Sequence, residues 1–135
     1  GAAVFAGGRV VVFGGLLDGT HLNTTELLDT QTMAFTAGPN MLTGRNICAA
    51  VQLDAERVLV LGGKSSAPLN TTEILHLSSN TVAPGPSMIS SRLACAAVAL
   101  GGGRILVVGG CGDDRDQLSS TEILSLDTMA FVPGP

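Results

Sequence analysis

Three apolar runs, each ending in a glycine pair, recur along the chain: RVVVFGG at 9–15, RVLVLGG at 57–63 and RILVVGG at 104–110. A shorter run of small apolar residues precedes each of them: AAVFA at 2–6, CAAVQL at 48–53 and CAAVAL at 95–100. Uninterrupted apolar runs of this length are typical of strands that are covered on both faces. A short turn separates the two runs each time, so we expect each pair to form a hairpin.

Two more short strands are expected after each glycine pair. The third strand of each set carries a Thr-Glu pair: TELLDT at 25–30, TEILHL at 72–77 and TEILSL at 121–126. The fourth ends in Gly-Pro: MAFTAGP at 33–39, NTVAPGP at 80–86 and MAFVPGP at 129–135. No window shows the 3.6-residue apolar period of an amphipathic helix, so no helix is predicted.

The four strands form a unit that occurs three times. The closing prolines, Pro39, Pro86 and Pro135, are 47 and 49 residues apart, and self-similarity at such a period indicates a repeat architecture. Four antiparallel strands per repeat, covered on both faces, are typical of a β-propeller blade, with the Ala- and Cys-rich first strand innermost. We predict blade one at 1–39, blade two at 48–86 and blade three at 95–135, with connectors at 40–47 and 87–94.

The connectors carry a family resemblance. They read PNMLTGR at 39–45 and PSMISSR at 86–92, a Pro-x-Met-x-x-x-Arg motif. Together with the Gly-Gly runs, the variable loops and the Glu-containing strands, this motif resembles the kelch repeat over the whole chain. The WD repeat fits poorly, because the chain has no Trp and no Gly-His at the start of a unit. The resemblance implies an all-β fold of three four-stranded antiparallel kelch-type propeller blades within a larger ring.

The chain departs from the usual kelch pattern. Kelch repeats usually carry a Tyr in the third strand and a Trp seven residues later. Here those positions hold Leu28 and Phe35, Leu75 and Val82, and Leu124 and Phe131. Three blades are also fewer than the 4–8 of closed propellers. We therefore expect a fragment of a longer protein, with two copies forming a six-bladed ring as the alternative, and we expect the exposed apolar end faces to favour self-association.

Composition and charge narrow the function classes. The net charge of −4, with only seven Lys and Arg and no basic stripe, argues against a nucleic-acid partner. No apolar run reaches about 18 residues, so no membrane span is predicted. The three cysteines fit no disulfide framework or zinc pattern, and no metal or cofactor is predicted. The chain has no Tyr, which galactose-oxidase-like and sialidase-like propellers require, so no catalytic residue is predicted.

Recurring charged residues and glycines are interpreted as framework, because an active site seldom repeats once per blade. These residues are Glu26, Glu73, Glu122, Arg45, Arg92, Gly14, Gly15, Gly62, Gly63, Gly109 and Gly110. We expect each Glu to pair with the Arg of the connector that follows it, Glu26 with Arg45 and Glu73 with Arg92. This hypothesis leaves Glu122 without a partner.

The cysteines and two asparagines have structural interpretations. Cys48 and Cys95 are expected to be small buried side chains, whereas Cys111, which follows a glycine pair, is the candidate reactive thiol. Asn23 and Asn70 begin Asn-Thr-Thr sequons that would be used only in a secreted protein. A role in turning the chain into a strand is the simpler interpretation.

The loops after the glycine pairs differ while their surroundings are constant: LLDGTHLN at 16–23, KSSAPLN at 64–70 and CGDDRDQLS at 111–119. Loops on a rigid frame often carry binding residues. We therefore predict a non-enzymatic module that binds a protein or peptide through this face. The candidate contacts are Asp18, His21, Lys64, Ser65, Asp113, Asp114 and Arg115. Two alternatives stay open: the scaffold of a propeller enzyme with catalytic groups outside this segment, and a surface or adhesion repeat with no single site.

Overall fold

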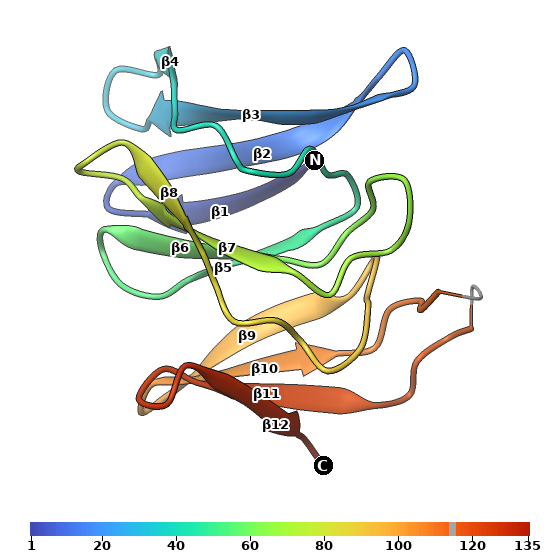
Figure 1. Cartoon of the computed structure of the whole chain (residues 1–135). Coiled ribbons are helices and arrows are strands. Elements are labelled where there is room, and N and C mark those ends of the chain that lie inside the picture. Colours follow the sequence, from blue (N-terminus) through green and yellow to red (C-terminus); the bar gives the residue numbers. More distant parts are fainter. Residues whose placement is uncertain (114–115) are drawn as a thin grey trace.

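The computed structural model of the chain describes residues 1–113 and 116–135, which contain twelve strands (Figure 1). The strands are β1 (Ala2–Ala6), β2 (Arg9–Leu17), β3 (Thr20–Asp29), β4 (Phe35–Ala37), β5 (Ala49–Gln52), β6 (Arg57–Leu61), β7 (Thr72–His76), β8 (Thr81–Pro84), β9 (Ala96–Gly101), β10 (Arg104–Val108), β11 (Thr121–Ser125) and β12 (Ala130–Pro133). The described residues include no helix that is long and apolar enough to cross a membrane.

The strands form three antiparallel sheets of four strands each, which we call the first sheet (β1–β4), the second sheet (β5–β8) and the third sheet (β9–β12). The sheets are stacked in chain order (Figure 1). Strand β1 lies beside β5, and β5 lies beside β9, so the first strands share one inner edge. The prediction of an all-β fold of three four-stranded antiparallel blades is confirmed.

Two apolar layers hold the stack together. In β6, Val58 and Val60 pack against the first sheet, whereas Leu59 and Leu61 pack against the third. All four side chains are fully buried, which explains why this strand is an uninterrupted apolar run. Complete burial of such a side chain is worth about 1.5–3 kcal/mol. The second sheet is therefore the middle of the core.

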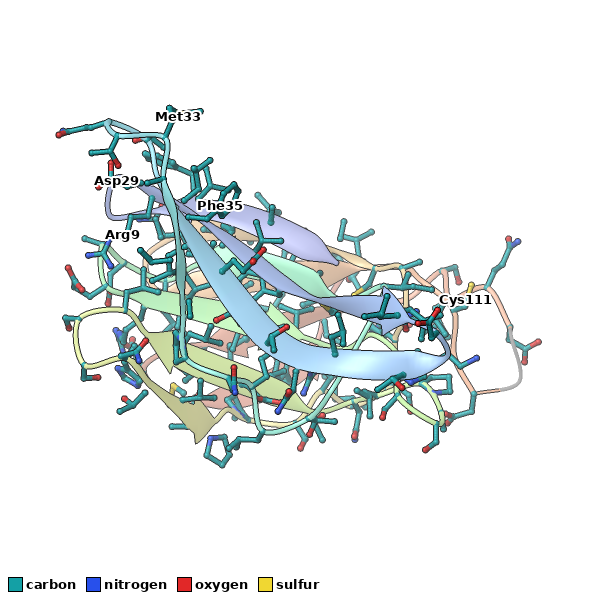
Figure 2. The ribbon with its side chains drawn as sticks, turned by 90° about the horizontal axis from the view of Figure 1, so that it is seen from above. Arg9, Asp29, Met33, Phe35 and Cys111 are labelled. Carbon is teal, nitrogen blue, oxygen red and sulfur yellow. The ribbon has the colours of Figure 1, made fainter. Side chains whose placement is uncertain are left out.

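The outer faces of the two end sheets are only partly covered. Phe5 and Phe35 on the first sheet are both 58% exposed, and Val98 and Val132 on the third sheet are 50% and 52% exposed. Figure 2 shows Phe35 on the outer side of the first sheet. Phe35 lies opposite Leu28 on the neighbouring strand, as the kelch-like spacing of seven residues requires for a β3–β4 pair.

The segment after the first glycine pair differs from the prediction. Residues 16–23 were expected to form a loop, but β2 continues to Leu17 and β3 begins at Thr20. Asp18 and Gly19 form the two-residue turn, with φ of 48° and 81°. Asp-Gly favours this type I′ geometry, in which both central residues have positive φ. The expected loop is therefore the tip of a long hairpin.

Each internal glycine pair marks the place where a connector lies against a sheet. The N–H of Gly15 donates to the carbonyl oxygen of Arg45 at 3.0 Å, and the N–H of Gly63 donates to that of Arg92 at 2.8 Å. A Cβ at Gly62, whose φ is 60°, would collide with the Arg92 carbonyl oxygen. Glycine is thus required here both by the backbone angle and by the close approach of the connector.

We predict that Gly62→Ala destabilises the fold more than Gly109→Ala does. The φ values are 60° and 62°, so both variants lose about 1–2 kcal/mol by placing Ala in the left-handed region. Only Gly62 meets a connector carbonyl; at Gly109 the nearest atom is the Leu118 oxygen, 3.4 Å away. Overpacking should cost Gly62→Ala about 1–3 kcal/mol more. Urea unfolding of both variants measures the difference, and equal losses would contradict the role given to the connector.

Candidate functional site

The connector at 40–47 is held to the edge of the first sheet by its backbone. The N–H of Arg45 donates to the Leu22 carbonyl oxygen at 3.0 Å, and the Arg45 carbonyl accepts from Gly15. Asn23 Nδ2 donates to the Met41 carbonyl oxygen at 3.1 Å, and the Met41 side chain is buried in the layer between the first two sheets. Asn23 therefore fixes the connector, beyond the turning role that its sequence position suggested.

The side chain of Arg45 crosses from this connector to the second sheet. It is fully buried, and its Nη1 donates to the carbonyl oxygens of Gly62 at 2.9 Å and Thr71 at 3.1 Å. Its Nη2 lies 2.5 Å from Glu73 Oε1. Glu73 also accepts the backbone N–H groups of Leu42 at 2.6 Å and Thr43 at 3.0 Å. One carboxylate thus neutralises the guanidinium and holds the connector backbone.

The same arrangement recurs between the second and third sheets. Arg92 Nε lies 3.0 Å from Glu122 Oε1, and both side chains are buried. Arg92 Nη1 donates to the carbonyl oxygens of Gly109 at 2.8 Å and Ser120 at 3.0 Å. Glu122 accepts the backbone N–H of Ile89 at 2.7 Å. In both pairs the guanidinium charge is met by a carboxylate, as the interpretation of these residues as framework expects.

The predicted partners of the glutamates are wrong by one repeat. Each Arg pairs with the Glu of the sheet that follows its connector, so Arg45 pairs with Glu73 and Arg92 pairs with Glu122. Glu26 is exposed and makes no ion pair with any residue that the structure describes. The physical reason is that the connector backbone is bound to the preceding sheet, so the side chain of its Arg extends toward the next sheet.

Removal of the buried carboxylate should be far more costly than removal of its exposed equivalent. We predict that Glu73→Ala lowers the free energy of unfolding by about 3–5 kcal/mol, because it leaves the Arg45 charge buried without compensation. Glu26→Ala, at the same position of another repeat, should change it by no more than about 0.5 kcal/mol. Thermal and urea unfolding followed by circular dichroism test this pair; similar losses in both variants would refute the assignment.

Of the predicted contact residues that the structure describes, three lie beside connectors: His21, Lys64 and Asp113. The backbone of His21 packs against Gly44, and Lys64 exchanges two backbone hydrogen bonds with Asn46. Asp113 Oδ2 accepts a hydrogen bond from Ser91 Oγ at 3.2 Å. Asp18 is at the exposed tip of the β2–β3 hairpin, and Ser65 is in the loop after Lys64. Asp114 and Arg115 lie outside the described residues.

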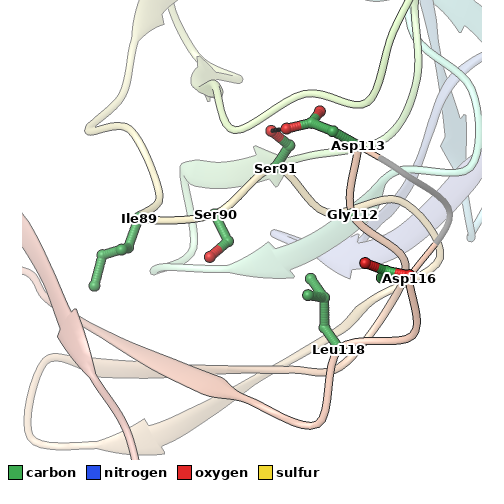
Figure 3. Close-up of a pocket in the computed structure, with 7 residues that line it drawn as sticks. All are labelled: Ile89, Ser90, Ser91, Gly112, Asp113, Asp116 and Leu118. Atoms are coloured by element: carbon green, nitrogen blue, oxygen red, sulfur yellow. Dashed lines mark hydrogen bonds between the residues drawn. The ribbon is translucent and has the colours of Figure 1, made fainter.

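An open pocket of about 340 Å³ lies between the second connector and the loop that follows β10 (Figure 3). It is lined by Ile89, Ser90, Ser91, Gly112, Asp113, Asp116 and Leu118. Two carboxylates, two hydroxyls and two aliphatic side chains line this pocket and can receive a group that is both apolar and hydrogen-bond donating. Of the described residues, no group of three or more His, Cys, Asp and Glu side chains is placed to hold a metal ion.

Sequence reasoning missed the exposed apolar residues of this face. Leu42 and Ile89, at equivalent connector positions, are 60% and 56% exposed. Each follows a buried Met, and each has its backbone N–H bound to a buried Glu. Leu16 and Leu17 on the long hairpin are exposed as well. The signal that could have found Leu42 and Ile89 is the recurrence of a large apolar residue next to the connector methionine.

The three cysteines are free and differ in their surroundings. Burial raises the pKa of the Cys48 thiol, and burial likewise raises the pKa of Cys95. Cys111 is half-buried and pairs with Leu93 of the second connector through its backbone. Figure 2 places Cys111 at the opposite end of the molecule from Met33. Cys48 is buried as predicted, whereas Cys95 is half-buried like Cys111, so the prediction of a buried side chain is wrong for Cys95. Cys111 remains the candidate reactive thiol, because burial raises the pKa of the other two.

We predict that iodoacetamide modifies Cys111 of the native chain first and Cys48 last. A raised pKa lowers the thiolate fraction near pH 8, and only the thiolate attacks the reagent. Mass spectrometry of peptides from a time course gives the three rates, and the same reaction in urea supplies the control in which the differences should disappear. Native modification of Cys48 as fast as Cys111 would contradict the prediction.

Four-stranded antiparallel sheets, stacked along their inner strands and joined from outer to inner strand, define the chain as a set of propeller blades. The Kelch motif matches residues 1–42 and 92–135. The chain therefore belongs to the kelch-repeat family. Comparison with curated proteins gave no match. The second sheet lies entirely outside the matched residues, yet it has the same strand order and the same buried Arg–Glu contact as the third.

Proposed function

We propose that the chain is a protein-interaction module that binds a protein or peptide through the face formed by the connectors and the β2–β3, β6–β7 and β10–β11 loops. Kelch motifs are generally associated with protein interaction. The observation that carries the proposal is the exposure of Leu42 and Ile89 on connectors whose backbone is fixed by buried carboxylates. Because the backbone that carries these two side chains is already fixed, a partner that covers them has less of the chain to order.

The surroundings of these two residues support a partner with mixed chemistry. Ile89 borders the pocket that also contains Asp113 and Asp116, so an apolar contact and a hydrogen-bond donor or cation are accommodated together. The loops that differ between repeats lie next to the constant connectors, as a surface built for selectivity requires. An extended peptide with apolar and basic side chains fits this combination.

Substitution of the exposed connector residues tests the proposal. The partner is first isolated by cross-linking to the wild-type chain. We predict that the double variant Leu42→Ser, Ile89→Ser binds this partner at least tenfold more weakly. A tenfold loss corresponds to about 1.4 kcal/mol, which is a modest loss for two apolar anchors. The matched control, Val98→Ser with Leu100→Ser, alters exposed apolar residues of the third sheet's outer face. Quantitative affinity measurement with the purified partner gives the result. Unchanged affinity in the first variant, or an equal loss in both variants, would show that the connector and loop face does not bind the partner.

A further inference from the structure

Strand β4 is the outer edge of the first sheet, and β3 is its only neighbour in that sheet (Figure 1). The carbonyl oxygen of Ala34 and the N–H of Gly38 are both hydrogen-bonded to β3, at 3.0 Å and 2.9 Å. Because backbone groups alternate in direction along a strand, the N–H and carbonyl groups of Phe35 and Ala37 point away from the sheet. Both residues are exposed, and these groups have no backbone partner among the described residues.

The other two sheets carry a proline at the position of Ala37. Ala37, Pro84 and Pro133 each lie opposite the repeated Glu of the neighbouring strand, so the three positions are equivalent. Proline has no N–H, and prolines in sheets lie on edge strands, where they hinder pairing with a further strand. Pro84 and Pro133 therefore block the outer edges of the second and third sheets, whereas Ala37 leaves that of the first sheet open.

Charge does not protect this edge either. No Asp, Glu, Lys or Arg occurs between Thr30 and Gly44, although charged side chains are another common protection of edge strands. The neighbouring strand β3 contributes only carboxylates, Glu26 and Asp29, so an acidic segment would be repelled. The ring of Phe35, which is 58% exposed, can pair with a β-branched or aromatic side chain on an adjacent strand.

We propose that the outer edge of β4 binds an extended, non-acidic segment of another protein, with β-branched or aromatic side chains, as a fifth strand of the first sheet. In such complexes main-chain hydrogen bonds supply the affinity and alternate side chains supply the selectivity. The site is separate from the loop face: Met33, beside β4, and Cys111 lie at opposite ends of the molecule (Figure 2).

A second copy of the chain fits this edge less well. Strand β4 has 3 residues, and two such strands alone would bury far less than the roughly 1,200–2,000 Å² of a stable interface between folded proteins. Each copy also has a net charge of −4, which opposes their association.

The probe is the acetylated and amidated peptide Thr-Val-Thr-Val-Thr, added to the ¹⁵N-labelled chain and followed by NMR. We expect saturable shifts of the amide signals of Phe35, Thr36 and Ala37 at millimolar peptide. Ala37→Pro, which introduces the residue of the other two repeats, should weaken binding about tenfold or more, because it removes an outward donor and no internal hydrogen bond. Pro84→Ala should have the opposite effect and produce new shifts around Val82.

Matched controls keep each outcome decisive. The same peptide with its central residues N-methylated lacks the donors and should not bind, and Thr-Glu-Thr-Glu-Thr should bind about tenfold more weakly or worse. Unchanged urea midpoints show that the variants are folded; if Ala37→Pro is unfolded, the absence of new shifts in Pro84→Ala overturns the proposal.

Three further results would contradict the site. The first is the absence of shifts around Phe35 in the wild-type chain, or shifts that survive Ala37→Pro in the folded variant. The second is a concentration dependence of the Phe35 signal without peptide, which would make a second copy the occupant. The third is a set of shifts confined to Leu42 and Ile89, which would assign the peptide to the loop face.

Discussion

A guanidinium buried between two sheets is the interaction on which the stacking of this molecule depends. An isolated buried charge is so costly that it survives only where every neighbour is in place. Arg45 is compensated by Glu73 and two backbone carbonyls, although its Nε has no partner among the described residues. These partners come from the far sheet, while its own backbone is bound to the near one. Hydrophobic packing in the apolar layers stabilises the stack but is non-directional. The buried ion pair is directional, because its hydrogen bonds form only when the two sheets are aligned in one way.

The same interaction shapes the candidate binding face. Besides their ion pairs, Glu73 and Glu122 each accept hydrogen bonds from two connector N–H groups. The residue immediately after each connector Met is therefore fixed by its backbone, while its side chain, Leu42 or Ile89, is left outside. The buried carboxylate that links two sheets therefore also fixes the backbone of an exposed apolar residue, which the proposed function assigns to partner binding. The variable loops can change around this point without loosening it.

Periodicity and composition were sufficient for the strands but not for their contacts. The apolar runs before the glycine pairs predicted buried strands because both faces of β6 are covered. The partner of each Glu could not be read from the repeat, since Arg45 lies between Glu26 and Glu73 in the sequence and only the direction of the connector decides between them. The Asp18-Gly19 pair is the sequence signal for a two-residue turn and so for the long first hairpin. The loops at the same position of the other two repeats favoured a loop here instead. The exposure of Leu42 could not be predicted from the hydrophobicity of the sequence, because a large apolar residue next to a buried Met looks like another core residue.

Comparison of equivalent positions shows that neighbours, more than residue identity, set the environment of each repeat. Glu73 is 2% exposed and Glu26 is exposed, although the same strand of the same unit presents both. A Cβ at Gly62 would collide with a connector carbonyl, whereas a Cβ at Gly109 would make only an ordinary contact with the Leu118 oxygen, 3.4 Å away. In repeat proteins the stability of a unit is approximately its own contribution plus that of its interfaces. The second sheet, with an Arg–Glu pair and a connector on each side, has both interfaces, and each end sheet has one. The second sheet is also the one without an aromatic residue at either of the usual kelch positions, where Leu75 is fully buried opposite Val82.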